Sequence, residues 1–173
     1  MPRYDVPKAA PEPLRLVQLF VNTVDREHGR EWIGTVRDLR GWLRDRGLSA
    51  RGIDGAAVAR AHELREALRE LLLANNGETC DRAALEVVGR ADVDVRLTGP
   101  AAIDLRGASP LDEIVAVAYV AMLDGTWTRL KACRNCRWAF YDYSKNRSAG
   151  WCSMLICGNR SKTRAYRRRR THA

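Results

Sequence analysis

Four of the five cysteines stand in two closely spaced pairs near the end of the 173-residue chain. Two residues separate the cysteines of the first pair, four separate those of the second, and fifteen lie between the pairs. This spacing is typical of a structural zinc site, in which four thiolates surround the ion and leave no place for a water or a substrate. We therefore predict a Zn²⁺ site of structural role, with two disulfides or an iron–sulfur cluster as the alternatives. The predicted ligands are Cys133, Cys136, Cys152 and Cys157.

A strongly basic segment follows the last cysteine. If a helix begins near Arg160, its turn of about 100° per residue places four arginines within about 100° of one another. Such a helix has no apolar stripe to bury, so it faces solvent or a partner. Guanidinium groups bind phosphates and guanine edges, so we predict nucleic-acid contacts here, with a solvated basic tail as the alternative. The predicted contacts are Arg160, Lys162, Arg164, Arg167 and Arg168 on the helix, with Lys145 and Arg147 in a turn between the cysteine pairs.

The charge of the chain is divided unevenly. Residues 129–173 hold thirteen Lys and Arg against one acid, a net charge of +12, whereas residues 1–128 hold seventeen against twenty, a net charge of −3. A mildly acidic body therefore precedes a basic C-terminal module, and this asymmetry favours a polyanionic partner.

Aromatic residues alternate with polar ones between the two cysteine pairs. Trp138 and Phe140 would share one face of a strand, with Tyr141 on the other face. Aromatic side chains next to basic ones can stack on nucleobases. A module this small has little other apolar area, so we expect Trp138, Phe140 and Trp151 to pack around the metal instead.

Hydrophobic spacings of three and four residues predict a mainly helical body. Thr35, Asp54 and Ser109 are the predicted N-caps, and Thr35 forms a capping box with Asp38. The helix after Ser109 is apolar on most of its circumference, which predicts a buried central helix. The expected helices cover residues 14–24, 36 to about 47, 55 to about 75, 82–88, and 110 onward through Trp127 and Leu130 toward the first cysteine.

The period changes to two in residues 93–97 and 101–105, and Thr98-Gly99-Pro100 lies between these runs. This pattern predicts a β-hairpin. The predicted fold class is therefore mainly α with a small β-hairpin: a helical domain over residues 1–128 and a four-cysteine zinc finger with a basic C-terminal helix over residues 129–173.

The sequence contains no recognisable enzyme motif, neither a phosphate-binding glycine loop nor a Ser/His or Cys/His constellation, so we do not expect an enzyme. Asn22 and Thr23 are polar residues on an apolar helix. They either make local hydrogen bonds or face an internal ligand pocket. No apolar run approaches the ~18 residues of a membrane span, and the N-terminus lacks the apolar core of a secretory signal, so we expect a cytoplasmic protein without a membrane partner.

The cysteine segment closely resembles the CGNR zinc finger. The resemblance rests on CGNR at residues 157–160, on WCSM at residues 151–154, on the first cysteine pair, and on the WAFYD and SKNR segments between the pairs. The sequence FVNTVD at residues 20–25 resembles the opening motif of the ABATE domain, which precedes the finger in that family. The resemblance implies that the four cysteines bind zinc, that the finger binds DNA, and that the body binds a small effector. It implies a bacterial, stress-induced transcriptional regulator.

Three functions therefore compete. The favoured one is a zinc-dependent, DNA-binding transcriptional regulator whose body senses a ligand or forms a homodimer, because one finger contacts few base pairs. The second is an RNA-binding or general nucleic-acid-binding protein. In the third, the finger is a protein-interaction module whose arginines meet an acidic partner.

Overall fold

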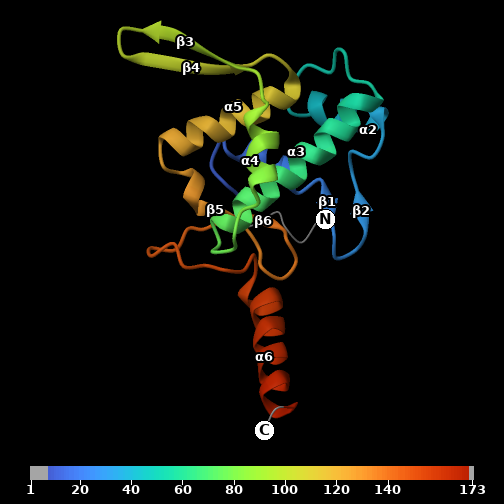
Figure 1. Ribbon diagram of the computed structural model, residues 1–173, viewed down its shortest axis with the longest axis vertical. Coiled ribbons are helices and arrows are strands. Elements are labelled where there is room, and N and C mark those ends of the chain that lie inside the picture. Colours follow the sequence, from blue (N-terminus) through green and yellow to red (C-terminus); the bar gives the residue numbers. More distant parts are fainter. Residues whose placement is uncertain (1–7, 172–173) are drawn as a thin grey trace.

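The computed structural model describes residues 8–171, and within the last helix it leaves out the side chains of Ala165, Arg168, Arg169 and Thr171. Five helices build the body (Figure 1). The predicted caps are confirmed, because Thr35, Asp54 and Ser109 each accept a backbone hydrogen bond at the start of a helix. The body helices are α1 (Arg15–Val21), α2 (Val36–Arg44), α3 (Gly55–Ala74), α4 (Arg82–Gly89) and α5 (Pro110–Leu123).

One hydrophobic core joins these helices. Phe20 on α1, Leu68 on α3 and Ile114 on α5 are all fully buried in it. The apolar α5 is buried on most sides, as its sequence predicts. Each Å² of apolar surface that is buried contributes about 25 cal/mol to folding, so this core is the main source of stability.

Three two-stranded antiparallel sheets complete the fold: β1 (Val24–Asp25) with β2 (Arg30–Glu31), β3 (Val93–Gly99) with β4 (Ala102–Gly107), and β5 (Leu130–Ala132) with β6 (Ala139–Tyr141). The predicted hairpin is β3–β4, which projects from the body at the end opposite the C-terminus (Figure 1). The predicted class, mainly helical with small hairpins, is confirmed.

Two predicted helices are longer than the observed ones. The first ends at Val21, because Asn22 leaves the helix and Val24 enters β1. The helix from Pro110 ends at Leu123 and does not continue to the first cysteine. Gly125 adopts a positive φ of 78°, which glycine tolerates, and a 3₁₀ turn over Trp127–Arg129 then leads into β5.

The pair β5–β6 lies between the body core and the cysteines. Ala139 and Tyr141 belong to the body core, whereas Phe140 between them packs with Cys133 and Cys157. Leu130 and Ala132 of β5 also enter the body core. Because successive side chains of a strand point to opposite faces, one face of this sheet completes the body and the other supports the thiols.

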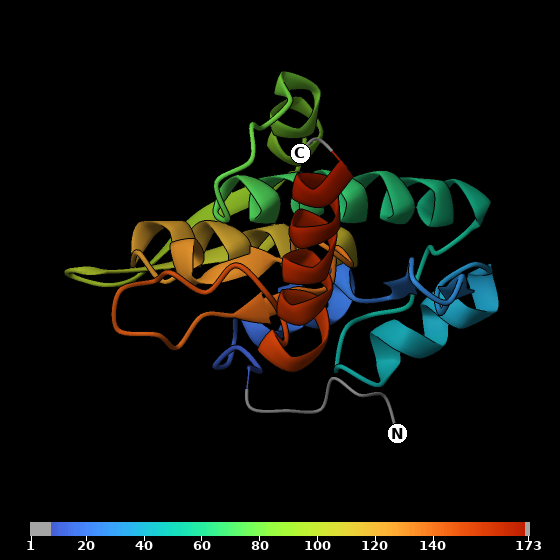
Figure 2. The ribbon, with the colours of Figure 1, turned by 90° about the horizontal axis from the view of Figure 1, so that it is seen from below.

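The chain ends in α6 (Asn159–Thr171), which follows a short π-helical turn over Met154–Gly158. This helix projects away from the rest of the molecule along its longest axis (Figure 1). Viewed from below, α6 stands in front of the middle of the body (Figure 2). The predicted helix after the last cysteine is therefore present, and it starts one residue before Arg160.

Candidate metal centre and basic helix

The four predicted thiols converge on one point. All four Sγ atoms lie within 4.8 Å of one another, with Cys136 and Cys152 at 3.5 Å and Cys152 and Cys157 at 3.6 Å. Four sulfurs at about 2.3 Å from a tetrahedral zinc ion would be about 3.8 Å apart. A disulfide needs about 2.05 Å, and all five cysteines are free thiols. The arrangement fits one four-coordinate metal ion, and not two disulfides.

Hydrogen bonds among the thiols divide their acidities. Bonds from the Cys136 and Cys152 thiols lower the pKa of Cys133 far below the usual value of a thiol. The bond to Cys133 raises the pKa of Cys136 to about 12, and the pKa of Cys152 is raised as well. The buried cluster thus favours a first thiolate at Cys133, and a bound metal ion would take the place of the remaining protons.

Local backbone geometry positions each thiol pair. In the first pair, Cys133 N donates to Trp138 O and Arg137 N donates to Cys133 O, both at 2.9 Å, with Arg137 at a φ of +64°. In the second pair, Ser153 Oγ accepts from Ile156 N at 3.3 Å. Asn135 Nδ2 bridges the two pairs by donating to Cys157 Sγ at 3.6 Å.

The aromatic residues divide between two environments. Phe140 and Trp151 pack with the cysteines, as expected. Trp138 does not belong to that cluster and instead lines a cavity on the body side. The expectation that Trp138 packs around the metal is therefore wrong: Trp138 precedes β6 (Ala139–Tyr141), so it does not share the strand face of Phe140, and its side chain lines the cavity.

A buried ion pair fixes the loop between the cysteine pairs. Lys131 Nζ lies 2.8 Å from Asp142 Oδ2, and both side chains are almost completely buried. Asp142 also accepts from the backbone N–H groups of Ser144 and Ala149, both at 2.9 Å. Burial alone would raise the pKa of Asp142, but the bonds from Lys131 and Ser144 outweigh it and lower this pKa to about 2.

The predicted nucleic-acid residues lie in two places. Lys162, Arg164 and Arg167 are exposed on α6. Arg160 pairs with Glu27 of the β1–β2 turn, and Arg164 Nη1 donates to Asn135 Oδ1 at 2.9 Å, so contacts on both sides tie the base of α6 to the rest of the protein. The side chain of Arg168 lies outside the described residues.

Lys145 and Arg147 are exposed in the loop that Asp142 holds. Arg147 has a φ of +52°, and its Nη1 donates to Thr128 Oγ1 at 3.0 Å. The structure therefore places these two residues on the finger loop between the cysteine pairs, and not on the projecting helix.

Two family models cover almost the whole chain. Residues 129–170 match the family described as "CGNR zinc finger". Residues 14–126, more than half of the chain, match the ABATE family, described as "Putative stress-induced transcription regulator". The chain belongs to the ABATE family. A comparison with curated proteins found no match.

Neither family description of this ABATE–CGNR protein names an enzymatic activity. Among residues 8–171, no helix is both long and apolar enough to cross a bilayer. The family match indicates a regulator-type protein, and the four-cysteine cluster is a site that could hold a metal ion.

Side-chain amides join the ABATE body to the finger. Asn22 Nδ2 donates to Ala139 O at 2.9 Å, and Ala139 N donates to Asn22 Oδ1 at 2.7 Å. Asn75 donates to the backbone of Trp127 and Leu130, both at 2.9 Å. Asn76 donates to Ala132 O at 2.7 Å and to Gly150 O at 3.0 Å. At Leu130, Ala132 and Ala139, these amides satisfy backbone groups that the two-stranded sheet β5–β6 would otherwise leave unpaired.

Two further residues lie at this seam between the body and the finger, and no sequence pattern identifies them. Arg69 is a fully buried arginine of α3, and it donates to Val21 O and to Arg137 O, both at 2.6 Å. Lys8 accepts from Tyr141 N at 2.8 Å through its carbonyl, and its Nζ donates to Trp151 O at 2.6 Å. Neither residue belongs to a pattern that marks it as a contact to the finger.

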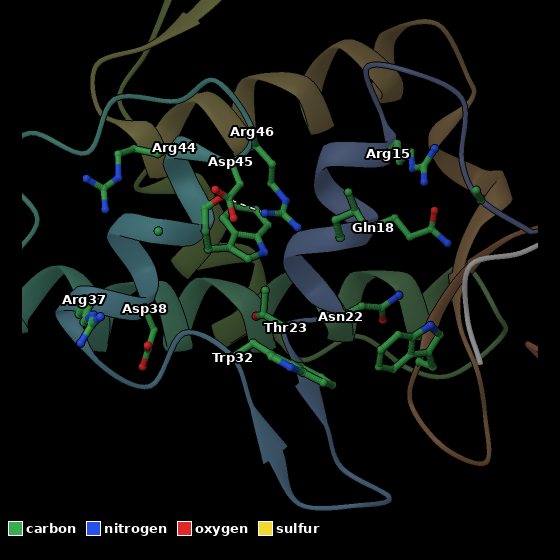
Figure 3. A pocket seen from close by; sticks show the side chains of 15 residues that line it. Arg15, Gln18, Asn22, Thr23, Trp32, Arg37, Asp38, Arg44, Asp45 and Arg46 are labelled. Atoms are coloured by element: carbon green, nitrogen blue, oxygen red, sulfur yellow. Dashed lines mark hydrogen bonds between the residues drawn. The ribbon is translucent and has the colours of Figure 1, made fainter. Parts of the chain in front are cut away.

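Asn22 and Thr23 both line a cavity of about 580 Å³ between α1 and α2 (Figure 3). Thr23 also makes a local hydrogen bond, donating from Oγ1 to Phe20 O at 2.8 Å. Both readings of this pair therefore describe part of its surroundings: local or cross-domain hydrogen bonds on one side and a cavity on the other.

Proposed function

We propose that this protein is a zinc-dependent DNA-binding transcription regulator. The observation that carries the proposal is the position of α6. It starts two residues after Cys157, projects from the molecule and, among the described side chains, presents mostly exposed basic groups (Figure 1). A metal ion held by the four thiols would fix the base of a positively charged helix.

We assign zinc to this donor set. Four thiolates form the ligand set of structural zinc sites, and the four Sγ atoms here lie close enough together to surround one ion. When bound, zinc would supply folding free energy, of the order of 10–16 kcal/mol in zinc-finger peptides. Zn²⁺ with four thiolates carries −2, so residues 129–173 would keep a net charge of about +10.

The shape of α6 favours duplex DNA over duplex RNA. Thirteen residues at about 1.5 Å each give a helix of about 20 Å. The major groove of B-DNA, about 12 Å wide, admits such a helix, whereas the major groove of A-form RNA is too narrow. We therefore assign α6 to the major groove and the Lys145–Arg147 loop to a flanking phosphate contact.

The test is fluorescence anisotropy of the zinc-loaded protein on a labelled duplex over a salt series. Seven basic contacts would give a slope of log affinity against log salt of about −6. The double variant Arg164→Ala/Arg167→Ala should reduce the slope by about 2 and leave the zinc content unchanged. The matched control is Arg82→Ala/Arg90→Ala on and beside α4, which also removes two exposed arginines. Equal losses in both variants would show that only net charge matters.

Selection from a random duplex library then separates regulation from general binding. A regulator should prefer one sequence at least about 10³-fold over bulk DNA. Tighter binding to single strands than to duplex DNA would favour an RNA-binding or general nucleic-acid-binding protein. Negligible binding to any nucleic acid at low salt would exclude both the DNA-binding and the RNA-binding functions. The remaining function would then be a protein-interaction module with an acidic protein partner.

A further inference from the structure

The cavity between α1 and α2 combines positive charge with aromatic surface. Its volume of about 580 Å³ lies within the range of small-molecule sites. Four arginines and two aspartates line it, which leaves an excess of two positive charges. The four arginines are Arg15, Arg37, Arg44 and Arg46, and the acids are Asp38 and Asp45.

Arg46 is the central cation of this cavity. Its guanidinium carbon lies 4.1 Å from the centre of the Trp42 ring, and its Nη1 donates to Trp42 O at 2.9 Å. Its Nε is buried and has no hydrogen-bond partner within residues 8–171. A buried N–H without an acceptor is rare in native proteins. Because this Nε is closed off from the cavity, the terminal Nη groups are the donors that Arg46 offers to a ligand.

The other arginines surround Arg46 without competing with it. Figure 3 shows Arg46 in the middle of the group, Arg37 and Arg44 on the α2 side and Arg15 on the α1 side. Asp38 is engaged at the start of α2, where its Oδ2 accepts from Thr35 Oγ1 at 2.6 Å. Arg15, Arg37 and Arg44 therefore raise the positive potential around Arg46. Asp45, next to Arg46 in the sequence, is the remaining acid of the cavity.

Three indoles give the cavity flat apolar surface. Trp32 is 42% exposed, unusually high for so large an apolar side chain, and lies along one edge of the cavity (Figure 3). Trp42 and Trp138 are more deeply buried and complete the lining. Indole faces bind planar rings by stacking, with gains beyond the area that they bury.

We propose that this cavity binds a small planar organic anion, with an aromatic carboxylate as the ligand class. The carboxylate accepts from the terminal Nη groups of Arg46, and the ring lies against Trp32 and Trp42. Arginine presents a planar pair of donors that matches a carboxylate, which is why the guanidinium selects this group over a neutral one.

The same cavity touches the residues that hold the finger. Trp138 precedes β6, and Asn22 carries the two hydrogen bonds to Ala139. Gln18, which also lines the cavity, donates from Nε2 to Ala139 O at 3.2 Å. An occupant that contacts Asn22 and Trp138 therefore stabilises the docked position of β6. Binding of the anion does not depend on DNA binding, and its test contains no DNA.

The test is calorimetric titration of the zinc-loaded protein with 2-naphthoate and with its neutral isostere 2-naphthamide. We expect one saturable site for the acid and at least tenfold weaker binding of the amide, because a charge-assisted bond contributes at least that factor. Arg46→Met should weaken acid binding at least tenfold, and the matched control Arg82→Met should leave it unchanged. Equal affinities for acid and amide, or no saturation by 2-naphthoate, benzoate or indole-3-acetate, would overturn the proposal.

If Arg46→Met fails to fold, the comparison of 2-naphthoate with 2-naphthamide on the unmodified protein is sufficient to test the proposal. Trp32→Leu adds a second variant at an exposed position and should weaken the acid and the amide alike. Hydrogen exchange then tests the link to the finger: the amides of β6 should exchange several-fold more slowly with 2-naphthoate bound. An unchanged rate in β6 with a saturated site would overturn the link.

Discussion

Asn22 and Ala139, 117 residues apart in the sequence, exchange two hydrogen bonds through one side-chain amide. The amide acts as a third strand beside β6, since it donates to the carbonyl and accepts from the N–H of the same residue. The opening motif of the ABATE body thus holds the first strand pair of the finger directly.

Replacing Asn22 by alanine should lower the free energy of unfolding by about 2 kcal/mol, because the N–H of the fully buried Ala139 loses its acceptor. Chemical denaturation of the zinc-loaded protein measures this value. Asn146→Ala, an exposed amide in the finger loop, is the control and should change stability by less than about 0.5 kcal/mol. A similar loss in both variants would mean that the seam bond contributes nothing specific.

The Lys131–Asp142 pair should make the free energy of unfolding fall as the pH is lowered. The folded pKa of Asp142, about 2, lies below the ordinary value of 3.8. The ionised carboxylate therefore stabilises the fold by about 2 kcal/mol above pH ~4, and this contribution disappears as the pH falls toward 2. Carboxyl NMR shifts should show a midpoint near pH 2 for Asp142, and a midpoint near 4 would refute this assignment.

Asp142→Asn should lower the free energy of unfolding by about 3–5 kcal/mol at neutral pH, which is more than protonation of Asp142 does. The reason is that the substitution leaves the Lys131 ammonium buried without its counter-charge. Thermal unfolding of the zinc-loaded variant measures the loss. The double variant Lys131→Met/Asp142→Asn should recover part of it. No recovery would indicate that the backbone bonds of Asp142, and not the ion pair, carry the effect.

Removal of the metal ion should unfold only part of the chain. With Cys152→Ser, or with a chelator, we expect rapid hydrogen exchange in residues 142–171 and persistent protection of the body helices. The reason is that Leu130, Ala132, Ala139 and Tyr141 remain packed in the body core without the metal. A single cooperative unfolding of the whole protein would contradict this division of the folded chain near residue 142.

The same packing predicts different behaviour for two shortened chains. A chain ending at residue 143 retains β5–β6 and should give a cooperative thermal transition. A chain ending at residue 128 lacks four core side chains and leaves apolar surface open, so it should not. Circular dichroism and calorimetry distinguish these outcomes, and a stable fold for the shorter chain would show that the helices suffice alone.

The helix α6 should become more ordered on DNA. Arginines four residues apart repel one another along it, and its described side chains bury almost no apolar area. Addition of a duplex should therefore slow hydrogen exchange in residues 160–171, whereas a body helix such as α4 should not change. If α6 is equally protected with and without DNA, the helix is stabilised by the finger alone.

Local signals in the sequence predicted much of this molecule. The caps at Thr35, Asp54 and Ser109, the β3–β4 hairpin and the helix after Cys157 all follow from short-range patterns, and the structure confirms them. The convergence of the four cysteines was predictable for the same reason, since metal-ligand spacing is a local property.

The seam was not predictable, because it depends on tertiary contacts. Asn75 and Asn76 resemble an ordinary helix end, yet their amides bond backbone groups more than fifty residues away. Arg69 falls among the leucines of α3 and is buried by partners from two distant segments. Trp138 has the pattern of a metal-packing residue, but the strand begins only at Ala139, and the tertiary structure places the Trp138 side chain on the cavity.

The shared sheet also constrains the order in which the protein can be made. Ribosomes add residues from the N-terminus at about 5–20 per second. The ABATE helices are complete well before Ala139 and Tyr141 are synthesised, so the emerging body lacks one wall of its core for that interval. The segment that supplies this wall also carries the first two thiols. A newly made body can therefore finish folding only when its metal-binding cysteines begin to appear, which ties maturation of the helical half to synthesis of the finger.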